Sequence, residues 1–328
     1  MMQLLTKRDE VLEALGQAQL RECPLFCPNA ESPDEIEGLL LAASDFKKQQ
    51  GLDDLVMGMG ITSCYPDHPQ LQRLSLNDSP DMLPTLQTWF AWLKVYANRQ
   101  GLFDGIRIIP FLDHGWVPDS RDVKLMMDPQ VQEQFGIIMF DASALDLSEN
   151  IRLTRDYVQQ AGQRVVVEGC PDKILSEAEI LAKGLSAENM LTDPLVAGDF
   201  VQQTGVDLIV PSLGTEHRAT GHDVQYHGEI ARKIKEQIGT KLALHGTSSL
   251  GNRIGNIGAD GIIKVNFYTA MARCASQQLR TSWAKIPAAD SLPIQQACGS
   301  EVLSVRRQEV RKIALSMLEN LLRAMDVK

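Results

Sequence analysis

The chain has 328 residues, 44% of them hydrophobic, and a formal net charge of −10 at pH 7. Its apolar content supports a large core, the absence of a strong basic cluster argues against nucleic-acid binding, and no run reaches the roughly 18 apolar residues of a membrane span. Segment 1–19 is amphipathic and lacks a signal peptide's apolar centre, so we expect a cytoplasmic protein without a membrane partner. The six cysteines form no CxxC pair and are expected to be free thiols.

Short apolar runs rich in Val, Ile and Leu alternate with helical patterns along the chain. Most of these runs are apolar on both faces, which is typical of parallel strands covered by helices. The predicted strands are PLFCP (24–28), DLVMGMGIT (54–62), IRIIPFL (106–112), GIIMFD (136–141), RVVVE (164–168), DLIVPS (207–212), KLALH (241–245) and GIIKVNF (261–267).

Helical patterns occupy the segments between these runs. The first of them begins at Ser32-Pro33, a cap followed by a first-turn proline. Three others close with glycine, which is typical of helix C-termini. The last is a long amphipathic helix at the end of the chain. The predicted helices are 33–50, 82–100, 148–162, 193–205, 227–239 and 301–325.

Eight strands separated by helices predict an α/β fold, a (β/α)8 TIM barrel with a long C-terminal helix. A doubly wound open sheet is the main alternative, and the absence of GxGxxG after the first strand weakens it. We expect a single domain over residues 1–328 that includes a C-terminal helical extension, 301–328. The long connections 63–105 and 169–206 are typical of active-site loops.

Side chains that can bind a metal follow several of the predicted strands. Asp113 and His114 end the third strand, Glu168 ends the fifth, and His217 and His245 follow the sixth and seventh. Because the carboxyl ends of barrel strands meet at one face, these groups should converge. Three histidines with a carboxylate are a zinc-type ligand set. A single histidine there is more often a surface or hydrogen-bonded core residue, so the joint pattern carries the prediction.

The pair Asp113-His114 also predicts a local backbone feature. A regular strand would point the two side chains to opposite faces, so we expect the strand to end and turn there, in agreement with Gly115. The remaining histidines are interpreted as loop residues, His222 being a potential neighbour of the site; they are His68, His222 and His227.

The segments that follow the seventh and eighth strands predict an anion site. HGTSS (245–249) and VNFYT (265–269) are rich in small and hydroxyl residues. Barrels frequently bind phosphate with the loops after these two strands, through backbone N–H groups. A Ser/Thr helix cap is the alternative interpretation. Both can hold, because capping N–H groups are also phosphate donors.

The order and spacing of these motifs resemble the class II, metal-dependent ketose-bisphosphate aldolases, the family of fructose- and tagatose-bisphosphate aldolases. The resemblance runs from about Leu112 to Arg273, roughly half of the chain. The segments that carry it are LDHG (112–115), MFDASALDLSENIRLTRDYV (139–158), LTDPLVAGDFVQQTGVDLIVPSLGTEH (191–217), LALHGTSS (242–249) and IIKVNFYT (262–269).

This resemblance implies a lyase that reversibly cleaves a phosphorylated ketose, or a similar anionic sugar, through a metal-stabilised enediolate. It implies that His114, His217 and His245 bind Zn²⁺ or another divalent cation, with Glu168 as an additional carboxylate ligand. Asp113 would be the catalytic acid/base group on the hydroxyl of the cleaved bond. The residues implied for phosphate and hydroxyl binding are Gly214, Arg218, Gly246, Thr247, Ser248, Asn266 and Thr269.

The segment after the fifth strand departs from the family pattern. The family usually has a Glu-x-Glu-Leu-Gly run there, followed by a glycine-rich acidic loop that carries the proton donor, whereas this chain reads VEGCPDKILSEAE. Asp172, Glu177 and Glu179 are the candidate replacements, and solvated loop acids are the alternative interpretation of each.

Three more departures predict a divergent member for which fructose 1,6-bisphosphate is not the expected substrate. Arg218 stands where the family has a glycine, Tyr268 stands at its strand-eight aspartate, and GTSS replaces GGSG. Two alternative functions stay open, a metal-dependent sugar-phosphate epimerase or isomerase and a non-catalytic aldolase-like subunit.

The family commonly forms dimers or tetramers, so we expect a homodimer or homotetramer with a sugar phosphate as its small-molecule partner. The apolar stripe of the last helix could cover the barrel or a partner, and its arginines could be solvated or reach a neighbouring site. The stripe is Val310, Ile313, Ala314, Met317 and Leu321, and the arginines are Arg306, Arg307 and Arg311.

Overall fold

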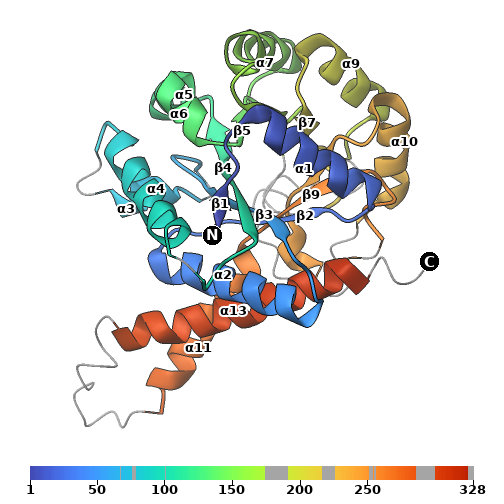
Figure 1. The fold of residues 1–328 in the computed structure, drawn as a ribbon. Coiled ribbons are helices and arrows are strands. Elements are labelled where there is room, and N and C mark those ends of the chain that lie inside the picture. Colours follow the sequence, from blue (N-terminus) through green and yellow to red (C-terminus); the bar gives the residue numbers. More distant parts are fainter. Residues whose placement is uncertain are drawn as a thin grey trace.

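A curled sheet of parallel strands forms the centre of the fold, with helices packed around it (Figure 1). Strands β2 to β9 follow one another around the sheet in chain order. A parallel bridge between Asn29 and Gly60 joins the ends of β2 and β3, so the sheet closes on itself. The strands are β2 (Leu25–Pro28), β3 (Leu55–Ile61), β4 (Ile106–Trp116), β5 (Ile137–Asp141), β6 (Val166–Gly169), β7 (Leu208–Ile209), β8 (Leu242–Leu244) and β9 (Ile262–Phe267).

This arrangement confirms the predicted (β/α)8 barrel with its long C-terminal helix. Every strand predicted from the sequence is a strand of the sheet, and β4 runs further than predicted, to Trp116. A short additional strand, β1 (Gln3–Leu4), pairs with β4 near its start. The computed structural model describes residues 1–66, 68–75, 79–99, 101–173, 191–215, 226–250, 254, 256–285 and 300–323.

The predicted helices are also present, and the chain contains further ones that the sequence analysis did not identify. Helix α11 was missed because few of its residues face the core, Met271 and Ala275 being the buried ones. No helix in the described part of the chain is long and apolar enough to cross a membrane. The predicted helices are α2 (Pro33–Gln49), α4 (Leu83–Ala97), α7 (Leu147–Ala161), α9 (Pro194–Thr204), α10 (Gly228–Ile238) and α13 (Ser300–Arg323). The others are α1 (Arg8–Leu20), α3 (Gln70–Leu74), α5 (Ser120–Met127), α6 (Pro129–Gln134), α11 (Thr269–Trp283) and the 3-10 helix η2 (Thr247–Ser249).

Helix α1 closes the barrel at the end where the strands begin. Its buried residues Val11, Ala14 and Leu15 join the apolar side chains that fill this end of the barrel. We call this cluster the apolar plug. Fully burying one aliphatic side chain contributes about 1.5–3 kcal/mol to the free energy of unfolding, so the plug stabilises the barrel at this end. The polar side chains of the barrel interior are therefore confined to the opposite end, where the strands terminate. The strand residues of the plug are Leu25, Cys27, Ile109, Phe111, Ile137, Val166, Leu208 and Ile263.

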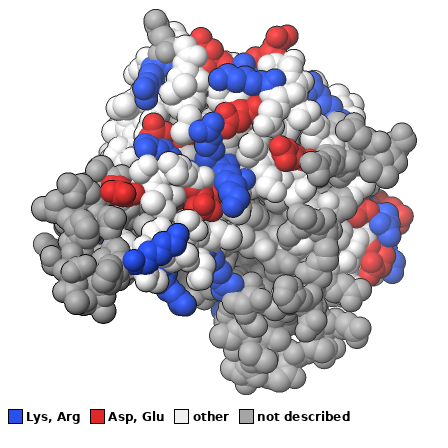
Figure 2. All heavy atoms as spheres, turned by 90° about the horizontal axis from the view of Figure 1, so that it is seen from below, with Lys and Arg blue, Asp and Glu red and all other residues white. Residues whose placement is uncertain are grey.

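Helix α13 packs along α2, and its apolar stripe covers the barrel's outer layer. Four of the five predicted stripe residues are buried, and Ile313 is partly buried. The three arginines in its first half, Arg306, Arg307 and Arg311, form ion pairs with acids of α2. They join Arg306 to Glu35 at 2.6 Å, Arg307 to Glu37 at 2.6 Å and Arg311 to Asp45 at 2.5 Å. Figure 2 shows the resulting face, on which basic and acidic side chains lie next to one another.

Gly38 of α2 permits this close packing. A Cβ at Gly38 would lie 2.7 Å from the Arg307 carbonyl oxygen and 3.0 Å from Val310 Cγ1. We therefore expect Gly38→Ala to destabilise the chain by about 1–3 kcal/mol, despite alanine's higher helix propensity. The measurement is the free energy of unfolding in urea.

The matched control is Gly16→Ala in α1, where a Cβ would meet nothing within 4 Å. This substitution should raise stability by about 0.5–1 kcal/mol through helix propensity alone. Equal effects of the two substitutions would contradict the packing argument.

Candidate metal centre and active site

A β-bulge in β4 brings two consecutive side chains into the barrel. Leu112 pairs with Ile138 and Gly115 pairs with Phe140, so Asp113 and His114 together oppose a single residue of β5. His114 has φ +50°, a left-handed conformation shared among the described non-glycine residues only with Glu22. The strand therefore continues through a bulge where the sequence analysis expected it to end and turn. Such backbone strain is typical of functional sites.

His114 and His245 face each other across the end of the barrel. His114 Nε2 lies 3.1 Å from His245 Nδ1, and both rings are buried. The outer nitrogen of each ring contacts a carboxylate: His114 Nδ1 lies 2.6 Å from Asp141 Oδ2, and His245 Nε2 lies 3.2 Å from Glu168 Oε1. Because ionised carboxylates only accept hydrogen bonds, the outer nitrogens carry the protons. In the neutral rings, both inner nitrogens then present lone pairs to the same point.

Asp113 completes this convergent group. Its Oδ1 lies 4.0 Å from His114 Nε2 and 3.8 Å from His245 Nδ1. Burial opposes its ionisation, but the neighbouring His114, His245 and Lys264 outweigh burial and lower the pKa of Asp113 to about 2. Asn29 and Asn266 each donate an amide hydrogen bond to the carboxylate, at 2.7 and 2.8 Å. Asp113 is therefore held ionised and in one orientation.

The charges of the other groups follow from the same surroundings. Burial opposes ionisation of Asp141 and Glu168, but hydrogen bonds and nearby positive groups lower the pKa of both. Burial lowers the pKa of His245 and so favours its neutral form, the form that binds metals. Burial also disfavours the charged form of His114, but Asp113 and Asp141 outweigh it and raise the pKa of His114.

This donor set fits a divalent cation. The three atoms that converge are one from each of Asp113, His114 and His245, all within 4.8 Å of one another. Among the described residues, the buried carboxylates of Asp113, Asp141 and Glu168 lie around the two rings, and Lys264 is the buried ammonium group that pairs with Glu168, so a cation would offset part of the negative charge. Carboxylates on the outer nitrogens of both rings are the usual supports of metal-binding histidines. In this arrangement His114 and His245 would bind the ion through their inner nitrogens, with the Asp113 carboxylate beside it.

Glu168 takes a position that the sequence did not indicate. It contacts the outer nitrogen of His245, and Lys264 Nζ lies 2.8 Å from its Oε2. Both side chains are almost entirely buried. In this geometry Glu168 orients a histidine, and its role as a direct metal ligand stays a prediction.

The loop after β8 has the form of an anion site. Gly246 has φ +67°, a conformation that favours glycine, and it precedes η2. Thr247 donates a hydrogen bond to the Asn266 carbonyl, which joins this loop to β9. Ser248 Oγ accepts a hydrogen bond from the Ala270 backbone N–H at 3.0 Å, in the first turn of α11. This contact ties the start of α11 to the loop, whereas the expected cap was for a helix directly after the seventh predicted strand, where η2 has no side-chain cap.

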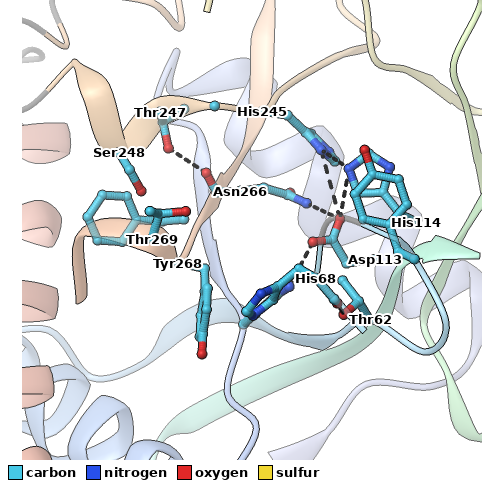
Figure 3. Close-up of a pocket in the computed structure, with 14 residues that line it drawn as sticks. Thr62, His68, Asp113, His114, His245, Thr247, Ser248, Asn266, Tyr268 and Thr269 are labelled. Atoms are coloured by element: carbon cyan, nitrogen blue, oxygen red, sulfur yellow. Dashed lines mark hydrogen bonds and ion pairs between the residues drawn. The ribbon is translucent and has the colours of Figure 1, made fainter. Parts of the chain in front are cut away.

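A pocket connects the convergent histidines to this loop (Figure 3). Tyr65 stacks on the His114 ring with centroids 4.2 Å apart. His68 and Tyr268 form another part of the wall, with ring centroids 4.5 Å apart. His68 is thus a loop residue, as interpreted, but it also lines the pocket. The lining residues are Asn29, Thr62, Tyr65, His68, Asp113, His114, His245, Gly246, Thr247, Ser248, Asn266, Phe267, Tyr268 and Thr269.

Most of the described site residues predicted from the sequence line this pocket, and the three that do not are Glu168, Gly214 and Asp172. Gly214 has φ +84° and does not line the pocket, although its neighbour Thr215 donates to the His245 carbonyl at 2.7 Å. Asp172 is partly buried, which raises its pKa, and it lies outside the pocket lining. The predicted residues outside the described part of the chain are Glu177, Glu179, His217 and Arg218.

Sequence reasoning missed Asn29, Tyr65 and Lys264. Asn29 directly follows β2, so the rule that barrel sites lie at strand ends could have identified it. Tyr65 lies in a loop without a distinguishing pattern. Lys264 lies inside an apolar strand, and a charged residue inside a buried strand is itself a signal that a partner exists.

Comparisons with known proteins point to an aldolase family. The family model described as "Fructose-bisphosphate aldolase class-II" matches residues 86–325. A fructose-bisphosphate aldolase of Giardia intestinalis is 32% identical over 247 residues, covering 73% of this chain and 64% of the relative. The YdjI protein of Escherichia coli is 30% identical over 142 residues, covering 42% of this chain and 50% of that protein. The chain thus aligns with about half to two thirds of the length of these relatives.

Solved structures share the fold over nearly the whole chain. The fructose-bisphosphate aldolase of Campylobacter jejuni has a TM-score of 0.72 at 16% identity, covering 99% of this chain and 96% of that one. The YdjI aldolase of E. coli has a TM-score of 0.62 at 18% identity, covering 98% and 97%. At these identities the likeness establishes the barrel fold.

The hydrogen bond between Asp141 and His114 predicts an effect on metal affinity. In Asp141→Asn, the amide can donate to His114 Nδ1 and move the ring proton to Nε2, where it would block a metal. We expect zinc affinity, measured by calorimetric titration, to fall about 10- to 100-fold. Asp156→Asn, on the exposed face of α7, is the control and should leave the affinity unchanged. Equal affinities of the two variants would refute the proposed support.

Proposed function

Because the chain belongs to the class-II fructose-bisphosphate aldolase family, we propose that it is a metal-dependent aldolase. Its substrate is a phosphorylated ketose or a similar anionic sugar, which it cleaves reversibly between two carbons. The observation that carries this proposal is the pair of facing nitrogens on His114 and His245, 3.1 Å apart beside the ionised Asp113.

Asp113 is the base of this reaction. Carbon–carbon cleavage requires removal of the proton from the hydroxyl on the carbon that becomes the aldehyde, and a positioned carboxylate can accept it. The amides of Asn29 and Asn266 occupy one lone pair on each oxygen of Asp113 and fix its orientation. In the reverse direction the protonated Asp113 returns this proton to the new hydroxyl.

The metal in this proposal is zinc or another divalent cation, bound by His114 and His245 with His217 as the predicted third ligand. When bound, the ion supplies a Lewis acid that stabilises the negative charge developing on the substrate oxygens. Asp141 and Glu168 hold the outer nitrogens of His114 and His245, so the inner nitrogens are the atoms through which these two rings would bind the ion.

The substrate's phosphate, or an equivalent anion, binds at the loop from Gly246 to Ser248 and at the start of α11. Backbone N–H groups and hydroxyls supply the donors there, and the helix N-terminus favours negative charge. The pocket connects this loop to Asp113, so one small sugar phosphate can occupy both ends. Arg218 is our proposed additional partner of the anion.

We also propose a cytoplasmic homodimer or homotetramer, as the family resemblance implies. Size-exclusion chromatography with light scattering measures this oligomeric state directly, and a monomer at assay concentrations would refute it.

The central test is a retro-aldol screen over phosphorylated and sulfonated ketoses with zinc present. We expect cleavage of at least one ketose, its loss after exhaustive chelation, and no activity in His245→Ala. Full cleavage after metal removal would overturn the metal-dependent mechanism. Proton exchange into the substrate without cleavage would instead support an epimerase or isomerase, and absence of bound metal in protein purified without chelators would support a non-catalytic subunit.

Asp113→Asn separates the base from the metal site. The amide is nearly isosteric but cannot accept the hydroxyl proton, so we expect kcat to fall at least about 10²-fold. Zinc content, measured by mass spectrometry, should stay close to that of the wild type. Retained turnover in Asp113→Asn would refute its role as the base.

A further inference from the structure

Lys264 is a buried cation inside the barrel, and a second β-bulge places it there. Leu242 of β8 pairs with Ile262 and Ala243 pairs with Lys264, so β9 carries one extra residue at Ile263. Ile263 belongs to the apolar plug, and Lys264 still reaches the polar end. Its exposed fraction is 1%.

The ammonium group of Lys264 is fully engaged. It lies 2.8 Å from Glu168 Oε2 and donates to Glu168 Oε1 at 3.2 Å. It donates to Asn266 Oδ1 at 2.6 Å. Below these contacts it sits over the Phe111 ring, 4.6 Å from the centroid. Burying an ammonium group is costly unless it is paired, so these contacts define one position for its nitrogen.

The contact of Lys264 with Asn266 affects Asp113, the proposed base. An amide has an oxygen that accepts and a nitrogen that donates, and the two are nearly equal in size. Because Lys264 donates to Asn266 Oδ1, the Asn266 nitrogen is the atom that faces Asp113, where it donates at 2.8 Å. Without the lysine, Asn266 Oδ1 loses its donor, and the amide keeps only its hydrogen bond to Asp113 to fix its position.

The contact of Lys264 with Glu168 affects His245, a proposed metal ligand. Lys264 holds Glu168, and Glu168 accepts from His245 Nε2, so the proton stays on the outer nitrogen of that ring. His245 Nδ1 is thereby left with its lone pair directed toward His114. A single buried ammonium group thus orients both the base and one metal-binding histidine.

We propose that Lys264 is a positioning residue for the aldol reaction, which acts on Asp113 through Asn266 and on His245 through Glu168. This inference rests on the proposed function. A residue that only neutralised the charge of Glu168 would not orient the Asn266 amide. If Lys264 does orient this amide, turnover should depend on Lys264 even when the metal is bound and the fold is intact.

The test compares Lys264→Met with the double variant Lys264→Met/Glu168→Gln and with Glu168→Gln alone. Lys264→Met leaves Glu168 as an unpaired buried charge, so its melting temperature should fall. The double variant removes this charge and keeps an oxygen for His245, so its melting temperature should recover most of the loss. Lys235→Met is the control, since that partly buried lysine donates to the Ala259 carbonyl and does not line the pocket.

Three measurements follow on each folded variant: zinc affinity by calorimetry, and kcat and KM for the cleaved ketose at saturating zinc. For Lys264→Met we expect zinc affinity and kcat each to fall about 10- to 100-fold, with a smaller change in KM. In the double variant kcat should stay low although stability returns. Lys235→Met should match the wild type throughout.

In the double variant, kcat could recover together with stability, to the level of Glu168→Gln alone. This result would mean that Lys264 only neutralises the charge of Glu168, and it would overturn the proposal. Unchanged zinc affinity and turnover in Lys264→Met would overturn it as well. Absence of zinc binding or of cleavage in the wild type would instead overturn the proposed function, and the zinc titration makes this distinction without a substrate.

Discussion

The site depends on one backbone constraint, the bulge at Asp113-His114. Regular strand alternation would send one of these side chains to the helix layer. The bulge directs both into the barrel, at the price of a left-handed conformation at His114. Gly115 makes it possible, since a Cβ there would lie 2.9 Å from the Met139 carbonyl oxygen. The proposed base and the proposed metal-binding ring therefore occupy adjacent residues.

The buried charges around this bulge form a connected network. Asp113, Asp141 and Glu168 are each nearly inaccessible to solvent, and each contacts a histidine, an amide or Lys264. Networks of this kind add little net stability but are strongly specific, because loss of one member leaves another charge unpaired. The apolar plug under α1 supplies the stability at the opposite end of the barrel. Stability and chemistry are thus separated along the barrel axis.

Much of the fold was predictable because it follows from local periodicity. The strands read as apolar runs and the helices as amphipathic repeats, and these patterns depend on nearest neighbours in the chain. Helix α11 escaped prediction because most of its surface is exposed. The partners of Arg306, Arg307 and Arg311 also escaped it, since acids of α2 lie some 270 residues away in sequence. The candidate histidines were found by their position after strands rather than by their surroundings.

The sequence by itself determined the barrel, the family resemblance and the convergence of Asp113, His114 and His245, because strand ends of a parallel barrel must meet at one face. Only the tertiary structure decided which ring nitrogens face each other, that Glu168 contacts His245, and that Lys264 contacts both Asn266 and Glu168. The physical reason is that these outcomes depend on two bulges. A bulge shifts the direction of side chains by one residue, and it is visible only in the pairing between strands.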